Sequence, residues 1–136
     1  MDYISNSLSE TEKLAKKFLT ENSDVKLVGL VGDLGSGKTA FVKGIAKALK
    51  IKRNITSPTF VIEKIYPYGD QKLVHIDAYR LSSSHDFEAI GFSELLADKL
   101  NIIFIEWPER VFSQFPENMK IIKFKYVDEK KRKISF

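Results

Sequence analysis

The chain has 136 residues, of which 43% are hydrophobic and 29% are charged. This composition is that of an ordinary globular protein and excludes wholesale disorder. The length predicts one domain, covering residues 1–136. There is no cysteine, which excludes disulfides and thiolate metal sites. The longest bulky apolar run in the C-terminal half is Ile102–Ile105, and the first residues do not resemble a secretory signal, so we expect a cytoplasmic protein with no membrane segment.

The net charge of +4 is unevenly distributed. Residues 119–136 contain seven Lys or Arg residues against two acids, and residues 43–53 contain five basic residues and no acid. Such runs occur on solvated surfaces and also at sites for RNA or an acidic partner. Charge alone does not choose between these interpretations.

The first half of the chain alternates between helical and strand patterns. Ser9 and Glu12 fit a capping box, which predicts a helix with Ser9 as N-cap that ends near Thr20. Residues 25–31 are mostly apolar, as in a strand covered on both faces. After a Gly-rich turn, apolar residues at helical spacing predict a second helix from near Lys38 to near Lys50.

The second half contains most of the expected strands. Residues 60–66 and 72–77 flank a turn and predict a hairpin. We expect short helices between residues 87 and 99, and strands at 101–106, 120–127 and 131–136. Strands that alternate with helices around a Gly-rich turn indicate an α/β fold, and the hairpins require a mixed β-sheet flanked by helices.

Residues Gly32–Thr39 read GDLGSGKT and match the pattern G-x-x-x-x-G-K-[ST] at every position. Glycines allow consecutive backbone N–H groups to turn toward the oxyanions of a triphosphate, and the following helix adds the positive end of its dipole. We expect Lys38 to contact the β- and γ-phosphates and the Thr39 hydroxyl to coordinate Mg²⁺. The motif follows a buried strand and opens an amphipathic helix, so it predicts a nucleotide-phosphate site in a P-loop NTPase-like sheet.

A P-loop normally works with an acid at the end of a neighbouring strand. Asp77 and Glu106 each end an apolar segment, and the segment before Glu106 has the more continuous apolar run expected of a central parallel strand. We therefore place Glu106 near the metal, and Asp77 in a supporting or water-positioning role. An acid at a strand end that only faces solvent is the alternative for each.

Three further features are compatible with this site. Residues 56–60, TSPTF, lie where switch loops of nucleotide hydrolases occur, although a Ser-Pro turn explains the same residues. Trp107 follows Glu106 and fits either a position over the site or the edge of the core. His75 and His85 have no third ligand at a suitable spacing, so they do not predict a zinc site.

Four blocks in order resemble one family: GDLGSGKT at 32–39, TSPTF at 56–60, HIDAYRL at 75–81 and EWPER at 106–110. They are similar to the TsaE (YjeE) family, bacterial ATPases required for the threonylcarbamoyladenosine modification of tRNA. The resemblance implies ATP and Mg²⁺ as cofactors. It also implies the TsaB–TsaD pair as protein partner, with ATP hydrolysis driving the assembly or turnover of that complex. Contact with tRNA is expected to be indirect or weak.

The resemblance also implies roles for individual residues. Thr39 and Glu106 correspond to the Mg²⁺ ligands, and Asp77 and Thr59 to catalytic or switch residues beside Glu106. Thr11 matches a threonine near the nucleotide, and Arg110 an arginine that approaches it. The phosphates are held by Asp33, Leu34, Gly35, Ser36, Gly37, Lys38 and Thr39.

Three other functions fit less well. A small-molecule P-loop kinase needs an acceptor pocket and usually an arginine-rich lid, but this chain has only Arg53, Arg80, Arg110 and Arg132. A GTPase would show Asp-x-x-Gly and Asn-Lys-x-Asp, which are absent from the sequence. An RNA-binding module that uses the basic runs leaves the P-loop unexplained.

Overall fold

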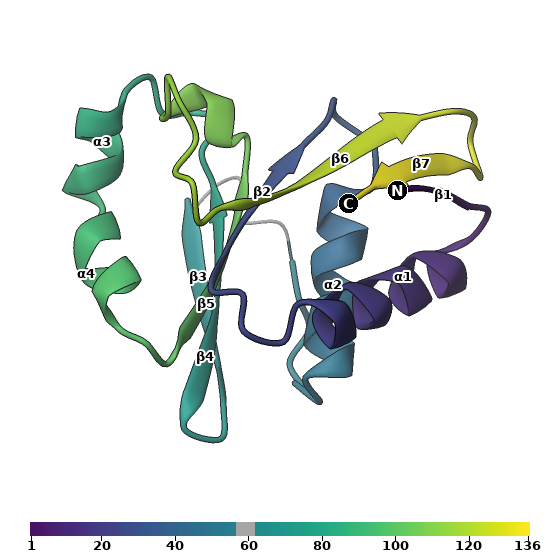
Figure 1. The fold of residues 1–136 in the computed structure, drawn as a ribbon, viewed down its shortest axis with the longest axis horizontal. Helices are drawn as coiled ribbons and strands as arrows, with labels where there is room; N and C mark the ends of the chain where they lie inside the picture. Colours follow the sequence, from purple (N-terminus) through teal and green to yellow (C-terminus); the bar gives the residue numbers. More distant parts are fainter. Residues whose placement is uncertain (57–61) are drawn as a thin grey trace.

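The computed structural model describes residues 1–56 and 62–136. Their strands form one seven-stranded mixed sheet in the order β1-β7-β6-β2-β5-β4-β3 (Figure 1). The strands are β1 (Asp2–Ser5), β2 (Leu27–Val31), β3 (Glu63–Tyr68), β4 (Gln71–Asp77), β5 (Asn101–Glu106), β6 (Lys120–Tyr126) and β7 (Arg132–Ser135). Strand β2 runs parallel to both neighbours, β5 and β6, and β4 runs parallel to β5. The remaining pairs, including both expected hairpins, are antiparallel.

Helices cover the two faces of this sheet. Helices α1 (Leu8–Glu21) and α2 (Lys38–Ala48) lie on one face, on the right in Figure 1. Helices α3 (Ser84–Ala89) and α4 (Phe92–Ala97) lie on the other face, and the 3₁₀ turn η1 (Pro108–Arg110) follows β5. None of the helices in the described residues is long and apolar enough to cross a membrane.

Each face of the sheet has its own apolar core. Phe18 of α1, Phe41 of α2 and Phe104 of β5 are fully buried in the first core. The second core contains Phe87 of α3 and Phe92 of α4. Since side chains alternate along a strand, even-numbered residues of β2 and β5 face α1 and α2, while odd-numbered ones face the second core. The α/β class and the mixed sheet flanked by helices are thereby confirmed.

The N-cap of the first helix lies two residues earlier than predicted. Ser7, not Ser9, is the N-cap, and its Oγ accepts a hydrogen bond from the backbone N–H of Glu10 at 3.1 Å. The Glu10 carboxylate in turn accepts the backbone N–H of Asn6 at 2.7 Å. Two overlapping Ser-x-x-Glu patterns occur here, and Glu12 is used instead in an ion pair with Lys47 of α2 at 2.9 Å.

Two elements were not predicted, and several boundaries shift. The edge strand β1 pairs with β7, but its four residues are too few for a recognisable alternation. The turn η1 is likewise only three residues long. Helix α2 ends at Ala48 rather than near Lys50, and β3 begins at Glu63, after residues 57–61, which lie outside the described part.

Candidate nucleotide-binding site

The P-loop connects the central strand β2 to the N-terminus of α2. Gly35 and Gly37 have φ angles of +77° and +104°, in the left-handed region that side chains with a Cβ avoid. Gly37 is the N-cap of α2, so the loop turns directly into the first turn of the helix. The loop lines a cavity of about 260 Å³ together with Asp77, Glu106 and Trp107.

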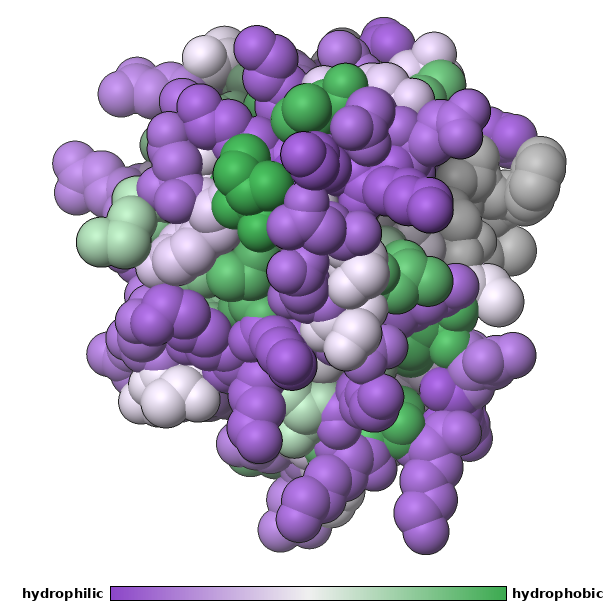
Figure 2. Space-filling view, turned by 90° about the vertical axis from the view of Figure 1, so that its right-hand side faces the viewer, coloured by the Kyte–Doolittle hydropathy of each residue, from purple (hydrophilic) through white to green (hydrophobic). Residues whose placement is uncertain are grey.

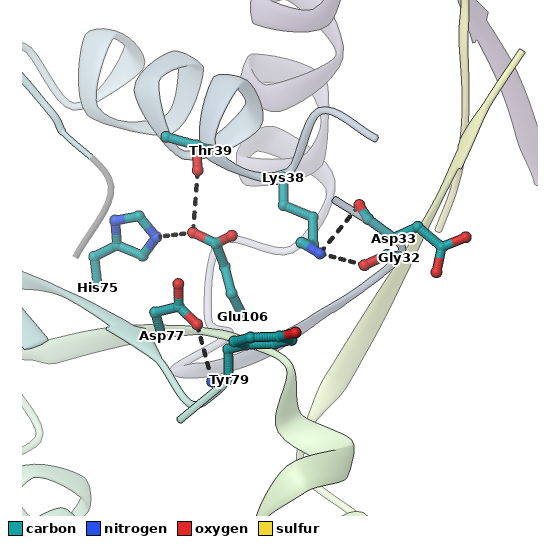
Figure 3. Close-up of polar contacts among 8 residues, drawn as sticks. All are labelled: Gly32, Asp33, Lys38, Thr39, His75, Asp77, Tyr79 and Glu106. Atoms are coloured by element: carbon teal, nitrogen blue, oxygen red, sulfur yellow. Dashed lines mark hydrogen bonds and ion pairs between the residues drawn. The ribbon is translucent and has the colours of Figure 1, made fainter. Parts of the chain in front are cut away.

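Lys38 is held inside this loop by the loop's own backbone. Its Nζ donates to the carbonyl oxygen of Gly32 and, at 3.3 Å, to that of Asp33 (Figure 3). The ring of Trp107 covers the ammonium group, with its centroid 4.1 Å from Nζ. Burial lowers the pKa of Lys38, an effect that the nearby carboxylates of Glu106 and Asp77 oppose. The lysine is therefore a desolvated cation at the floor of the cavity.

Three elements meet at the carboxylate of Glu106, the last residue of β5. Its Oε2 accepts the hydroxyl of Thr39 in α2 at 3.3 Å and lies 2.6 Å from Nε2 of His75 in β4. The Glu106 side chain is only 5% exposed, and that of His75 is completely buried. Figure 3 shows Thr39 and His75 approaching the same carboxylate oxygen from two sides.

Asp77 lies beside Glu106 because their strands are parallel and in register. The Cα positions of Asp77 and Glu106 are paired across β4 and β5. The Asp77 carboxylate accepts the backbone N–H of Tyr79 at 2.9 Å, which ties the acid to the turn that follows its strand. Two carboxylates, a lysine and a threonine hydroxyl thus converge at the carboxyl edge of the sheet.

A second cavity adjoins the P-loop on the side of α1. It has a volume of about 530 Å³, and its walls come from the start of α1, from the turn before β7 and from Gly37 and Ala40 of α2. Thr11 lines it, and its hydroxyl shares a 2.7 Å hydrogen bond with that of Ser5. Arg132 lines it too, and its Nε donates to the carbonyl oxygen of Gly35 at 2.9 Å. Both terminal strands thus contribute to this cavity, and Arg132 at the start of β7 also contacts the P-loop.

Two aromatic rings, those of Trp107 and Tyr79, lie between the P-loop cavity and the surface. The rings of Trp107 and Tyr79 lie 5.0 Å apart, centroid to centroid. The guanidinium of Arg110 lies over the Tyr79 ring, 4.8 Å from its centre. Trp107 has a φ of +60°, an unusual left-handed conformation for a bulky residue, which turns the chain sharply after β5.

The structure gathers most of the residues singled out in the sequence. Residues 34–39, Asp77 and Glu106 line the P-loop cavity, while Thr11 lines the adjoining one. Asp33 holds Lys38 through its backbone oxygen, and Arg110 packs on Tyr79 without lining either cavity. Thr59 lies outside the described residues.

Sequence reasoning missed His75 and Arg132. Both His75 and Asp77 lie on one face of β4 because they are two residues apart, so an i, i+2 rule applied to Asp77 could have found the histidine. Arg132 is one cation among seven in the C-terminal segment, and nothing local distinguishes it.

The donor set fits a nucleotide and a hard cation. The Ser36 hydroxyl is buried in the loop with no hydrogen-bond partner among the described residues, as expected of a group that awaits a phosphate oxygen. The candidate metal ligands, Thr39 and Glu106, offer oxygen atoms, and the Asp77 carboxylate lies beside them, which is the chemistry that Mg²⁺ prefers.

Comparisons with known proteins place this chain in a family. The model of the family "Threonylcarbamoyl adenosine biosynthesis protein TsaE" matches residues 5–134. The chain belongs to the TsaE family. The protein called tRNA threonylcarbamoyladenosine biosynthesis protein TsaE in Treponema pallidum is 38% identical over 138 residues, covering 99% of this chain and 98% of that one. The TsaE of Bacillus subtilis is 35% identical over 127 residues, covering 93% and 78% of the two chains.

A solved structure agrees with the TsaE assignment. The crystal structure of YdiB from Bacillus subtilis superposes with a TM-score of 0.71 at 28% sequence identity. It covers 98% of this chain and 82% of the YdiB chain. The sequence-based resemblance to TsaE and the α/β fold are thus both confirmed.

Proposed function

We propose that this chain is a Mg²⁺-dependent ATPase that acts in the biosynthesis of threonylcarbamoyladenosine on tRNA. The biosynthetic role follows from membership of the TsaE family. The observation that carries the ATPase activity is the convergence of a complete P-loop with Glu106 and Asp77 at one edge of the sheet. A tRNA-modifying role also fits the cytoplasmic location expected from the sequence.

The two cavities suggest how the nucleotide lies. The phosphates fit the cavity lined by residues 34–40, where backbone N–H groups and the start of α2 provide positive potential. Gly37 and Ala40 line both cavities, so the nucleoside has a direct path into the larger one. There Thr11 offers a hydroxyl, and Arg132 a cation that is already hydrogen-bonded to the P-loop.

Each residue then has a distinct task. Lys38 exchanges its contacts with the carbonyls of Gly32 and Asp33 for contacts with phosphate oxygens. The exchange is favourable because an ammonium group binds an anionic oxygen more strongly than a neutral carbonyl. Thr39 and Glu106 would hold Mg²⁺, which when bound neutralises charge on the β- and γ-phosphates. Asp77 is the acid best placed to orient the attacking water, since it lies beside Glu106 in register.

We further propose the TsaB–TsaD pair as the protein partner, which rests on the family resemblance. The contacts of Trp107 and Tyr79 support a coupling between nucleotide binding and partner binding. Trp107 covers Lys38, the residue that would bind the phosphates. Trp107 also contacts Tyr79, which in turn contacts Arg110, and both of these are exposed. These contacts would allow a change at Lys38 to affect a surface that a partner can contact.

The test is Mg²⁺-dependent ATP hydrolysis by the purified chain, alone and with its cognate TsaB–TsaD pair. We expect slow hydrolysis alone and strong stimulation by the pair. Tight ATP binding without stimulation would leave the nucleotide site standing and favour the small-molecule kinase instead. Absence of ATP binding would contradict the proposed function as a whole.

A further inference from the structure

His75 is a buried polar residue in the site to which the proposed mechanism gives no task. Its side chain has no solvent exposure, and its Nε2 lies 2.6 Å from Oε2 of Glu106. Nε2 is the ring nitrogen that faces the carboxylate, and the tautomer with a hydrogen on Nε2 can donate it to that oxygen. The other ring nitrogen, Nδ1, has no hydrogen-bond partner within residues 1–56 and 62–136. The polar contact of this ring is therefore directed at Glu106.

The fold makes this contact specific. His75 and Asp77 face the same side of β4, the side that α2 covers, and β4 is paired in parallel with β5. Asp77 is level with Glu106, whereas His75 is level with Phe104, two residues earlier. The imidazole thus contacts the Glu106 carboxylate from β4, two residues earlier along the sheet, while the Thr39 hydroxyl contacts it from α2.

Both donors contact the same oxygen atom. Thr39 Oγ1 and His75 Nε2 both bind Oε2 of Glu106, and neither binds Oε1. Figure 3 shows the second carboxylate oxygen on the side of Lys38. A glutamate carboxylate rotates easily about its last torsion, so two donors on one oxygen restrict this rotation and the direction of the other oxygen.

We propose that His75 is a positioning residue that holds the Glu106 carboxylate in the orientation needed to bind Mg²⁺. This inference rests on the proposed function, since it concerns the metal of the same site. Groups that hydrogen-bond to a metal ligand orient it, and their loss typically lowers metal affinity by about 10- to 100-fold. His75 is expected to act through Glu106 alone, without touching the nucleotide.

The test compares two amides at position 75. In His75→Gln the amide nitrogen can take the place of Nε2, whereas in His75→Asn it reaches only as far as Nδ1 and cannot contact Glu106. His75→Leu removes the donor altogether and serves if the Asn variant does not fold. His85→Asn makes the same chemical change at the exposed histidine and is the matched control.

The measurement is calorimetric binding of a non-hydrolysable ATP analogue at a series of Mg²⁺ concentrations, and also in EDTA. For His75→Asn and His75→Leu we expect the half-saturating Mg²⁺ concentration to rise about tenfold or more, with unchanged affinity in EDTA. The Gln variant is expected to stay within about threefold of the wild type, as is His85→Asn. Unaltered binding in EDTA also shows that the variants are folded.

Two outcomes would overturn the inference. If the Asn and Leu variants required no more Mg²⁺ than the wild type, or if Gln were as impaired as Leu, His75 would have only a packing role. If nucleotide binding by the wild type itself did not depend on Mg²⁺, the proposed function would fail first, and this inference with it.

Discussion

Lys38 is the residue on which nucleotide binding depends most directly. It is a buried cation whose hydrogen bonds go only to backbone oxygens of its own loop within the described structure. Those contacts can be exchanged for phosphate oxygens without moving the backbone. Lys43 lies in the same helix but is exposed, so it offers a comparison in which the same charge is removed away from the site.

We expect Lys38→Ala to weaken ATP binding by about 100-fold or more, because a charge-assisted contact to a phosphate contributes about 1.5–3 kcal/mol and the lysine makes more than one. Lys43→Ala should bind ATP as the wild type does. Calorimetric titration measures both. Equal affinities for Lys38→Ala and the wild type would refute the nucleotide site.

The two acids should be separable by substitution. Glu106→Gln is expected to raise the Mg²⁺ requirement about tenfold or more while metal-free nucleotide binding is retained, since it removes a charged ligand. Asp77→Asn should keep the Mg²⁺ requirement and lower the hydrolysis rate by about 10²- to 10⁴-fold, the range for loss of a general acid or base. Metal titrations and steady-state rates distinguish the two variants. If Asp77→Asn raised the Mg²⁺ requirement and Glu106→Gln did not, the two acids would have each other's roles.

At the scale of elements, the start of α1 matters because Thr11 in its first turn lines the larger cavity. The helix position depends on which of two serines caps it. Ser7 accepts the backbone N–H of Glu10, while Ser9 is exposed within the first turn. A cap at Ser9 would leave the first turn of the observed helix unformed.

Ser7→Ala is expected to reduce the free energy of unfolding by about 1 kcal/mol, the usual cost of a lost N-cap. Ser9→Ala should change it by less than about 0.5 kcal/mol, as for a surface substitution without a specific contact. Urea denaturation of both variants gives the two values. A larger loss for Ser9→Ala would restore the capping box predicted from the sequence.

At the scale of the whole molecule, the proposed nucleotide site joins parts of the chain that are distant in sequence. Its walls come from α1, the P-loop, the ends of β4 and β5, and the segment that enters β7. Unfolding any of these elements would destroy the site. A bound nucleotide should therefore stabilise the fold as a unit, rather than one loop.

We expect Mg²⁺–ATP at 100 times its Kd to stabilise the protein by about 2.7 kcal/mol. For a chain of this size that corresponds to a rise in Tm of about 10 °C. Differential scanning calorimetry with a non-hydrolysable analogue measures the shift, and Lys38→Ala at the same ligand concentration should show almost none. A similar shift in that variant would mean that the nucleotide binds elsewhere.

The P-loop, the buried strands around it and the acids at the strand ends were determined by the sequence itself. Each depends on residues that are neighbours along the chain: glycines that permit a left-handed turn, an apolar run that must be buried, and a carboxylate where that run stops. The sequence did not determine where the first helix begins. Ser7 and Ser9 carry the same local signal, and only the structure shows that Ser7 is the cap and that Glu12 pairs with Lys47 of α2 instead.

Tertiary structure alone decided the rest of the site. The contact of His75 with Glu106, the approach of Arg132 to Gly35 and the pairing of β1 with β7 each join residues far apart in the sequence. Such contacts depend on strand order and register, which are set by how the two apolar cores pack against the sheet. No local pattern carries that information, because the alternation of a strand specifies which face a side chain takes but not which residue it meets there.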